Sequence, residues 1–143
     1  MISVYTDGSC LGNPGNGGWA FLILGEKNIC YRTGFELNTT NNQMELVAVI
    51  KALEFLKEFR DISINTDSNY VKQGITTWII NWKKNNWKTS RKQPVKNKEL
   101  WIKLDSLVAN HDIDWKWIKG HSGHPQNERA DELANEAIIL KSK

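Results

Sequence analysis

Four acidic side chains stand where short predicted segments of secondary structure begin or end. Asp7 follows an alternating segment that starts at Ile2, and Asp67 follows a second alternating segment over 62–66. Glu45 falls in the first turn of a predicted helix, and Asp131 falls in the last predicted helix. Ligands gather beyond the carboxyl ends of strands in open α/β sheets, so we expect the two aspartates to be neighbours.

Clustered carboxylates repel one another unless a cation joins them, and hard oxygen ligands suit Mg²⁺ or Mn²⁺. Taken singly, each residue also has a structural explanation. Asp7 before Gly8 suits a turn, Glu45 complements a helix dipole, Asp67 caps a following helix, and Asp131 is a solvated side chain. Residue type and position alone favour these structural roles over a shared metal site. The longer motifs around the four residues decide between the two interpretations.

The periodicity of apolar residues predicts the elements that position these side chains. A run rich in Gly, Asn and Pro over 8–18 predicts a loop, and Thr40 with Gln43 forms a capping-box pattern. Pro125 is expected to open the last helix. The expected strands are 2–7, 19–24, 29–35, 62–67 and 114–119, and the expected helices are 40–59, 69–85, 99–108 and one from 125 onward. A strand that follows a helix indicates a mixed sheet.

Charge is distributed unevenly along the chain. From Ser68 to Lys98 there are eight Lys and Arg residues and no Asp or Glu, although the formal net charge of the chain is only +3. Trp78, Trp82 and Trp87 are interleaved with these cations. A solvated surface helix is the ordinary explanation for such a bias, but aromatic rings beside cations favour binding of nucleic acid.

Length and composition indicate a single domain spanning residues 1–143, with 40% hydrophobic and 24% charged residues. No signal peptide or transmembrane helix is predicted. The only two cysteines, Cys10 and Cys30, lack the spacing of metal ligands and are expected to be free thiols in a reducing cytoplasm.

Four stretches of the chain resemble the motifs of bacterial-type ribonuclease H. They are TDGSCLGNPG (6–15), TTNNQMEL (39–46), NTDSNYV (65–71) and KGHSGHPQNERADELA (119–134). A fifth stretch, 74–97, resembles the basic protrusion of the bacterial members, here about 78–97. The resemblance implies a three-layer α/β fold around a five-stranded mixed sheet whose first three strands are antiparallel.

The same resemblance implies the chemistry. Asp7, Glu45, Asp67 and Asp131 match the family's metal-binding carboxylates, which would hold two Mg²⁺ ions with Mn²⁺ as a substitute, and His121 matches its catalytic histidine. The implied reaction is endonucleolytic hydrolysis of the RNA strand of an RNA–DNA hybrid, leaving 5′-phosphate and 3′-hydroxyl ends. A transition-metal site that also uses His124 is the weaker alternative, because the family pattern uses oxygen ligands only.

Substrate contacts are also implied, on an RNA side, in a DNA-side channel, on the protrusion and in a phosphate pocket. The residues that match the RNA side are Cys10, Gly12, Asn13, Asn41, Asn42 and Asn69, and those that match the DNA-side channel are Tyr70, Trp78 and Trp82. Lys83, Lys84 and Lys88 lie on the protrusion, and Thr40 and Asn97 match the phosphate pocket. Two residues depart from the family, because Asn38 and Gln43 stand where members often have arginine. Four other tryptophans, 87, 101, 115 and 117, are assigned to the core.

Two other functions compete with this interpretation. A catalytically silent hybrid-binding module would keep the loops and the basic segment but lose metal ligands, whereas all four carboxylates are present. A transposase-like or junction-resolving nuclease is not expected to match the asparagine-rich RNA-side segments. The sequence therefore favours a monomeric hybrid nuclease without an obligate protein partner and without membrane association.

Overall fold

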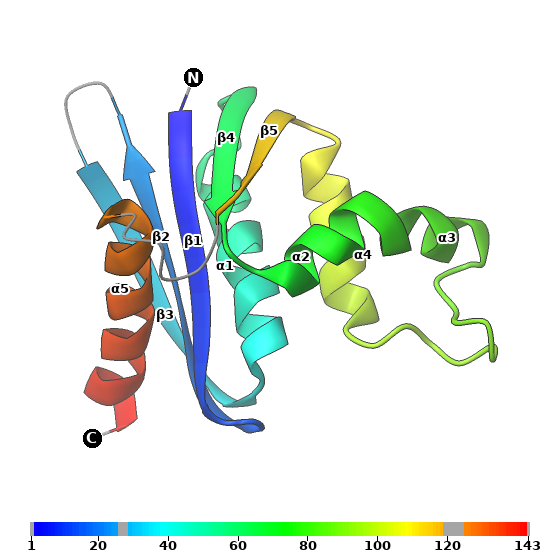
Figure 1. Ribbon diagram of the computed structural model, residues 1–143, viewed down its shortest axis with the longest axis horizontal. Coiled ribbons are helices and arrows are strands. Elements are labelled where there is room, and N and C mark those ends of the chain that lie inside the picture. The colour runs from blue at the N-terminus through cyan, green and yellow to red at the C-terminus, as the bar shows by residue number, and fades with distance from the viewer. Residues whose placement is uncertain (1, 26–28, 119–124, 143) are drawn as a thin grey trace.

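The computed structural model describes residues 2–25, 29–118 and 125–142 of the chain. Its sheet has five strands in the order β3-β2-β1-β4-β5 (Figure 1). The strands are β1 (Ile2–Gly12), β2 (Gly15–Leu24), β3 (Ile29–Thr39), β4 (Asp61–Thr66) and β5 (Asp112–Trp117). The first three pair antiparallel, and β4 pairs parallel with both β1 and β5. The predicted mixed sheet is confirmed.

Helices cover both faces of this sheet and make three layers (Figure 1). They are α1 (Asn41–Phe55), α2 (Asn69–Gln73), the π-helical turn η1 (Gly74–Trp78), α3 (Ile79–Lys84), α4 (Lys98–Val108) and α5 (Pro125–Ser142). Alternation along β1 supplies both cores, because Val4 packs in the cluster that contains α1 and α4, and Tyr5 packs against α5. None of the helices in the described ranges is both long and apolar enough to cross a membrane.

The first hairpin is longer than the sequence predicts. Residues 8–18 were expected to form a loop, but β1 continues to Gly12 and β2 begins at Gly15, so Asp7 lies inside a strand and does not end it. The glycines take part in the antiparallel pairing of the two strands. Gly8 pairs with Trp19, and Gly18 pairs with Ser9. Glycine at these positions lets the helices approach the strands closely. The loop predicted over 8–18 was wrong because it relied on the usual association of glycine with loops.

Two helices differ from the expected ones in their boundaries. Thr40 caps α1 by accepting a hydrogen bond from the Gln43 amide at 3.2 Å, but the helix ends at Phe55 and not at Phe59. There, the amide of Phe59 donates to the carbonyl of Leu56 and closes a tight turn before β4. The helix expected over 69–85 is interrupted by η1, where Gly74 faces Trp101; a Cβ atom on Gly74 would lie 1.9 Å from the ring.

Candidate active site

Asp7 lies on β1 immediately beyond the part of that strand that pairs with β4. The parallel ladder between the two strands ends at Tyr5 and Asn65. Alternation directs Asp7 to the same face as Tyr5, which α5 covers, and the side chain is only 6% exposed. Asp67 directly follows β4, as the sequence predicts. The end of the shared ladder therefore brings these two carboxylates together.

Glu45 reaches Asp7 because α1 lies very close to β1. A Cβ atom on Gly8 would lie 2.3 Å from the carbonyl carbon of Met44 and 2.4 Å from the nitrogen of Glu45. With glycine there, the Gly8 amide donates a hydrogen bond of 3.0 Å to Oε1 of Glu45. The backbone amide of Gly8, the residue after Asp7, thus holds the side chain of Glu45 in place.

Asp131 is positioned from the opposite face by the same device. A Cβ atom on Gly18 of β2 would lie 2.3 Å from the carbonyl oxygen of Ala134 in α5. Asp131 lies about one helical turn before Ala134, so this close packing places it above β1, where it shares a hydrogen bond with Asp7. All four predicted carboxylates therefore meet, positioned by β1, α1, the end of β4 and α5 together with two glycines.

Among the described residues, the carboxylates of this cluster are crowded together and none forms an ion pair with a cation. Carboxylate oxygens of Asp7, Glu45 and Asp67 lie within 4.8 Å of one another. Burial, followed by the charge of Glu45, raises the pKa of Asp7 to about 11. Burial also raises the pKa of Glu45, to about 7, although hydrogen bonds from Asp7 and Gly8 oppose the rise.

The oxygens of this cluster suit a hard divalent cation. Oε2 of Glu45 is buried and has no hydrogen-bond partner among the described residues, and one carboxylate oxygen of Glu45 belongs to the group with Asp7 and Asp67. A buried acceptor without a donor is costly, and a cation satisfies it while also neutralising the repelling charges. His121 and His124, the histidines singled out by the sequence, lie outside the described residues.

The RNA-side residues of the sequence analysis gather around the β1–β2 turn and the start of α1. Oδ1 of Asn13 accepts a hydrogen bond of 3.2 Å from the Asn41 amide, and Sγ of Cys10 donates to the Thr39 carbonyl at 3.3 Å. Gly12 adopts a positive φ of 76° in the turn. Asn42 and Asn69 are exposed at the first turns of α1 and α2.

Sequence reasoning missed Asn135, which belongs to this group. Its Oδ1 accepts a 2.7 Å hydrogen bond from the hydroxyl of Ser9. Asn135 stands four residues after Asp131, and residues at that spacing share a helix face. The spacing from Asp131 was the sequence signal that could have identified Asn135. Its hydrogen bond with Ser9 is a second contact between β1 and α5, in addition to that between Asp7 and Asp131.

The aromatic residues form one cluster around Trp101. Tyr70, Trp78, Trp82 and Trp87 follow one another with ring centroids 5.7 to 6.3 Å apart, and Trp101 lies 5.3 Å from Tyr70 and 5.5 Å from Trp82. Trp101 is fully buried, as assigned, whereas the other four rings are half-buried. Trp115 and Trp117 stack on each other at 5.4 Å and are also only half-buried. The half-buried rings keep partly accessible surfaces.

Gln43 stands between the two residues of the expected phosphate pocket. Its Nε2 donates to Oδ1 of Asn97 at 3.1 Å, and its Oε1 accepts from the hydroxyl of Thr39 at 2.7 Å. Nδ2 of Asn97 then donates to the hydroxyl of Tyr70 at 3.0 Å. The side chain therefore does not complete the capping box. It links α1 to the residue before α4 through neutral donors.

The lysines assigned to substrate binding lie on and after α3, which extends away from the sheet (Figure 1). Lys84 and Lys88 are exposed and line one hollow of about 550 Å³ together with Lys92. Lys83 differs, because its Nζ forms an ion pair of 3.3 Å with Asp105 of α4. Its charge is therefore partly neutralised within the chain.

Comparison with known proteins agrees with this geometry. The RNase H family model matches residues 1–139. A protein of Alcanivorax borkumensis called Ribonuclease H is 58% identical over 138 residues, covering 96% of this chain and 91% of its own length. The crystal structure of LC9-RNase H1 superposes with a TM-score of 0.84 at 36% identity, covering 97% of this chain and 72% of that one. That of LC11-RNase H1 in complex with an RNA/DNA hybrid has a TM-score of 0.73 at 28% identity and covers 100% of both chains.

Proposed function

Because the chain belongs to the ribonuclease H family, we propose that it cuts the RNA strand of RNA–DNA hybrids at a metal centre formed by Asp7, Glu45, Asp67 and Asp131. The observation that carries this assignment is the convergence of the carboxylates, with Oε2 of Glu45 buried and without a donor in the part of the chain that the structure describes. The type of enzyme is a hybrid-specific endoribonuclease of the bacterial type, with residues 78–97 as its basic protrusion.

Two Mg²⁺ ions, when bound by these carboxylates, would supply an activated water and stabilise the charge that develops at phosphorus and on the leaving 3′-oxygen. Mn²⁺ would supply the same chemistry. The products would then carry 5′-phosphate and 3′-hydroxyl ends. Four acidic ligands suit these ions because each prefers oxygen donors.

The chain's own residues prepare this centre in two ways. Asp7 is the most buried of the described carboxylates in the group and faces all the others, so it is the natural shared ligand. The Gly8 amide holds Glu45 by one oxygen and leaves the other directed to the group. A ligand that is already oriented does not lose side-chain freedom when the cation binds.

Discrimination between RNA and DNA requires contacts to the ribose 2′-hydroxyl. We assign these contacts to Cys10, Gly12 and Asn13 at the β1–β2 turn, Asn41 and Asn42 at the start of α1, and Asn69 at the start of α2. Tyr70, Trp78 and Trp82 would line the DNA strand, Thr40 and Asn97 would bind one of its phosphates, and Lys83, Lys84 and Lys88 would attract the backbone. The half-buried rings and the exposed cations at these positions support the assignment.

Several expectations stay predictions. His121 is expected to carry a proton near neutral pH or to aid product release, so that His121→Ala slows cleavage without abolishing it. The protein is expected to act as a monomer in the cytoplasm without an obligate protein partner.

One assay tests the proposed function directly. Labelled RNA–DNA hybrid, RNA duplex and DNA duplex are incubated with the protein in Mg²⁺ and in EDTA. Only the RNA strand of the hybrid should be cut, and only with the divalent metal. Efficient cleavage of the DNA duplex, or cleavage in EDTA, would overturn the assignment.

A further inference from the structure

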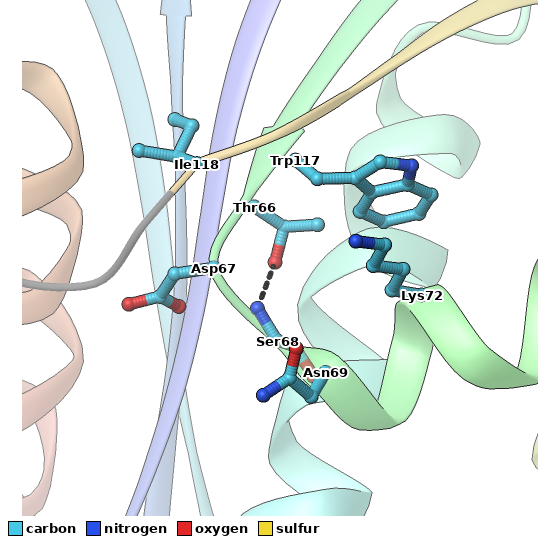
Figure 2. A pocket seen from close by; sticks show the side chains of 7 residues that line it. All are labelled: Thr66, Asp67, Ser68, Asn69, Lys72, Trp117 and Ile118. Atoms are coloured by element: carbon cyan, nitrogen blue, oxygen red, sulfur yellow. Dashed lines mark hydrogen bonds between the residues drawn. The ribbon is translucent and has the colours of Figure 1, made fainter.

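A recess of about 220 Å³ lies beside the carboxylate group, where β4 ends and α2 begins. Asp67 belongs to both, since it is one of the clustered carboxylates and also lines the recess. Figure 2 shows Asp67 and Ile118 on one side of the recess and Trp117 and Lys72 on the other. A ligand in the recess therefore lies next to the proposed metal centre without occupying it.

The groups that line the recess opposite Asp67 are mainly hydrogen-bond donors. Lys72 is exposed and forms no ion pair with any residue in the described part of the chain. The hydroxyl of Ser68 accepts from the Val71 amide at 3.2 Å, which leaves its hydrogen free to donate outward. Asn69 adds an exposed amide, and Trp117 forms a flat wall. Such a set accepts an anion at the end where Lys72 lies.

We propose that this recess binds an RNA-strand phosphate next to the one that is cleaved, and that Lys72 supplies the positive charge. The proposal rests on the proposed function, because it assumes that the RNA strand passes over the carboxylates. The carboxylate of Asp67 repels an anion, so the phosphate lies at the Lys72 end, close to the Ser68 hydroxyl. Asn69, assigned to the RNA side, lines the same recess and favours the RNA strand as the occupant.

The position of the recess also argues against the DNA strand. Of the residues assigned to DNA, Trp78, Trp82 and the lysines lie farther along the same helical segment, on η1, on α3 and in the loop that follows α3. Tyr70 lies on α2 with Lys72, but its ring packs on Trp101 and its hydroxyl accepts a hydrogen bond from Asn97. Lys72 instead lines the recess beside Asp67. A cation held in the recess instead of an anion is disfavoured, because Asp67 is its one carboxylate and Lys72 repels a second positive charge.

The test uses the whole protein with Mg²⁺ and a series of short hybrids. In one series each hybrid carries one uncharged methylphosphonate linkage at a different position of the RNA strand, and in a second series the linkage is in the DNA strand. Cleavage of the RNA strand at every site is read on a sequencing gel. In the wild-type protein, the uncharged linkage should suppress cleavage at the site whose neighbouring phosphate would occupy the recess. Lys72→Gln should lose this position-dependent suppression, while cleavage of the fully charged hybrid falls about threefold.

Two further variants make the result specific. Lys72→Arg keeps the charge and should restore the suppression pattern. Lys57→Gln removes an exposed lysine in the turn after α1, which forms no ion pair among the described residues, and should behave as wild type. The slope of log K against log salt, measured with Ca²⁺, should fall by about 0.7 to 0.9 for Lys72→Gln but not for Lys57→Gln.

Three outcomes would overturn the proposal. In the first, Lys72→Gln keeps the wild-type suppression pattern. In the second, it loses suppression only for linkages placed in the DNA strand. In the third, Lys57→Gln changes the salt slope as much as Lys72→Gln. Failure of the proposed function is distinct, because the wild-type protein would then leave the fully charged hybrid uncut in Mg²⁺.

Discussion

The amide of Gly8 donates a 3.0 Å hydrogen bond to Oε1 of Glu45, across 37 residues of chain. The contact joins the middle of β1 to the N-terminal half of α1, just past its first turn, and exists only because Gly8 lacks a side chain. It uses one oxygen of Glu45 and leaves Oε2 buried and without a donor among the described residues. One oxygen of the Glu45 carboxylate thus makes a structural contact, and the other is available for the proposed cation.

Gly8→Ala should damage both the stability and the activity of the protein. The added methyl group overlaps the backbone of Met44 and Glu45, which flexible side-chain motion cannot relieve. We expect a loss of about 1–3 kcal/mol in the free energy of unfolding, measured by urea titration, because overpacking has this cost. Cleavage should fall about tenfold or more, equivalent to about 1.4 kcal/mol of barrier. Wild-type activity in a folded Gly8→Ala protein would show that the Glu45 position tolerates displacement.

Asp7→Asn, unlike Gly8→Ala, should lower the activity of the protein while raising its stability without metal. The amide keeps size and polarity but removes the most buried negative charge of the group, so cleavage should fall more than about tenfold while hybrid binding in Ca²⁺ persists. Without metal, the variant should unfold at a higher temperature than wild type at neutral pH, because wild type must take up a proton on Asp7 to fold whereas asparagine needs none. Retention of more than about a tenth of the activity would exclude Asp7 as a shared ligand.

Stability without metal should decrease as the pH rises. The folded protein holds protons on Asp7 and Glu45, whose pKa values are raised to about 11 and about 7, whereas unfolded carboxyl groups release them near pH 4. Between about pH 4 and about pH 11 the native state therefore binds more protons, and the free energy of unfolding falls with pH.

Differential scanning fluorimetry in EDTA and in Mg²⁺ measures this linkage. Because the cation binds the deprotonated carboxylates, the increase in Tm caused by Mg²⁺ should grow from about pH 5 to about pH 9. Asp7→Asn provides the control and should show a smaller dependence. A Tm increase that is constant over this range would contradict the proposed protonation of the group.

Two adjacent lysines should contribute unequally to hybrid binding. Lys83 is paired with Asp105 at 3.3 Å, whereas Lys84 is exposed and faces the hollow that Lys88 and Lys92 also line. Lys84→Ala should reduce the slope of log K against log salt by up to about 0.9, and Lys83→Ala should reduce it less. Asp105→Asn, which frees Lys83, should steepen the slope. Equal effects of the two alanine variants would mean that the ion pair opens when the hybrid binds.

Asn38→Arg should strengthen binding but weaken the fold. Asn38 lines a hollow with Gln43 and has a φ of 50°, a left-handed conformation that asparagine tolerates better than arginine. The added cation should steepen the salt slope by about 0.7 to 0.9 if a phosphate lies nearby. The Tm should fall slightly because of the backbone strain. An unchanged slope would place Asn38 away from the substrate.

Gln43→Arg is the matched comparison for that variant. Arginine can still donate to Oδ1 of Asn97, but it offers no acceptor to the hydroxyl of Thr39, which Gln43 supplies at 2.7 Å. We expect a similar change in slope without strain at a positive φ. The two variants together report whether charge or backbone geometry limits binding at this edge of the protein.

Local patterns were sufficient to predict much of the molecule. Alternation predicted β4 and its end before Asp67, and a side chain at Thr40 predicted the start of α1, because both signals depend on residues close in sequence. The four carboxylates were identified from motifs and residue type. The structure brings them together where the parallel ladder of β1 and β4 ends.

The amino-acid sequence by itself determined which side chains could bind a cation and which segments alternate or repeat at helical spacing. Only the tertiary structure decided how closely they approach. Gly8 and Gly18 are loop-forming residues in a local interpretation, yet they lie in paired strands because α1 and α5 pack directly on them. Likewise, the partners of Lys83 and Ser9 lie 22 and 126 residues away, on α4 and α5. Contacts over such separations depend on how helices pack on the sheet, and no local pattern encodes that packing.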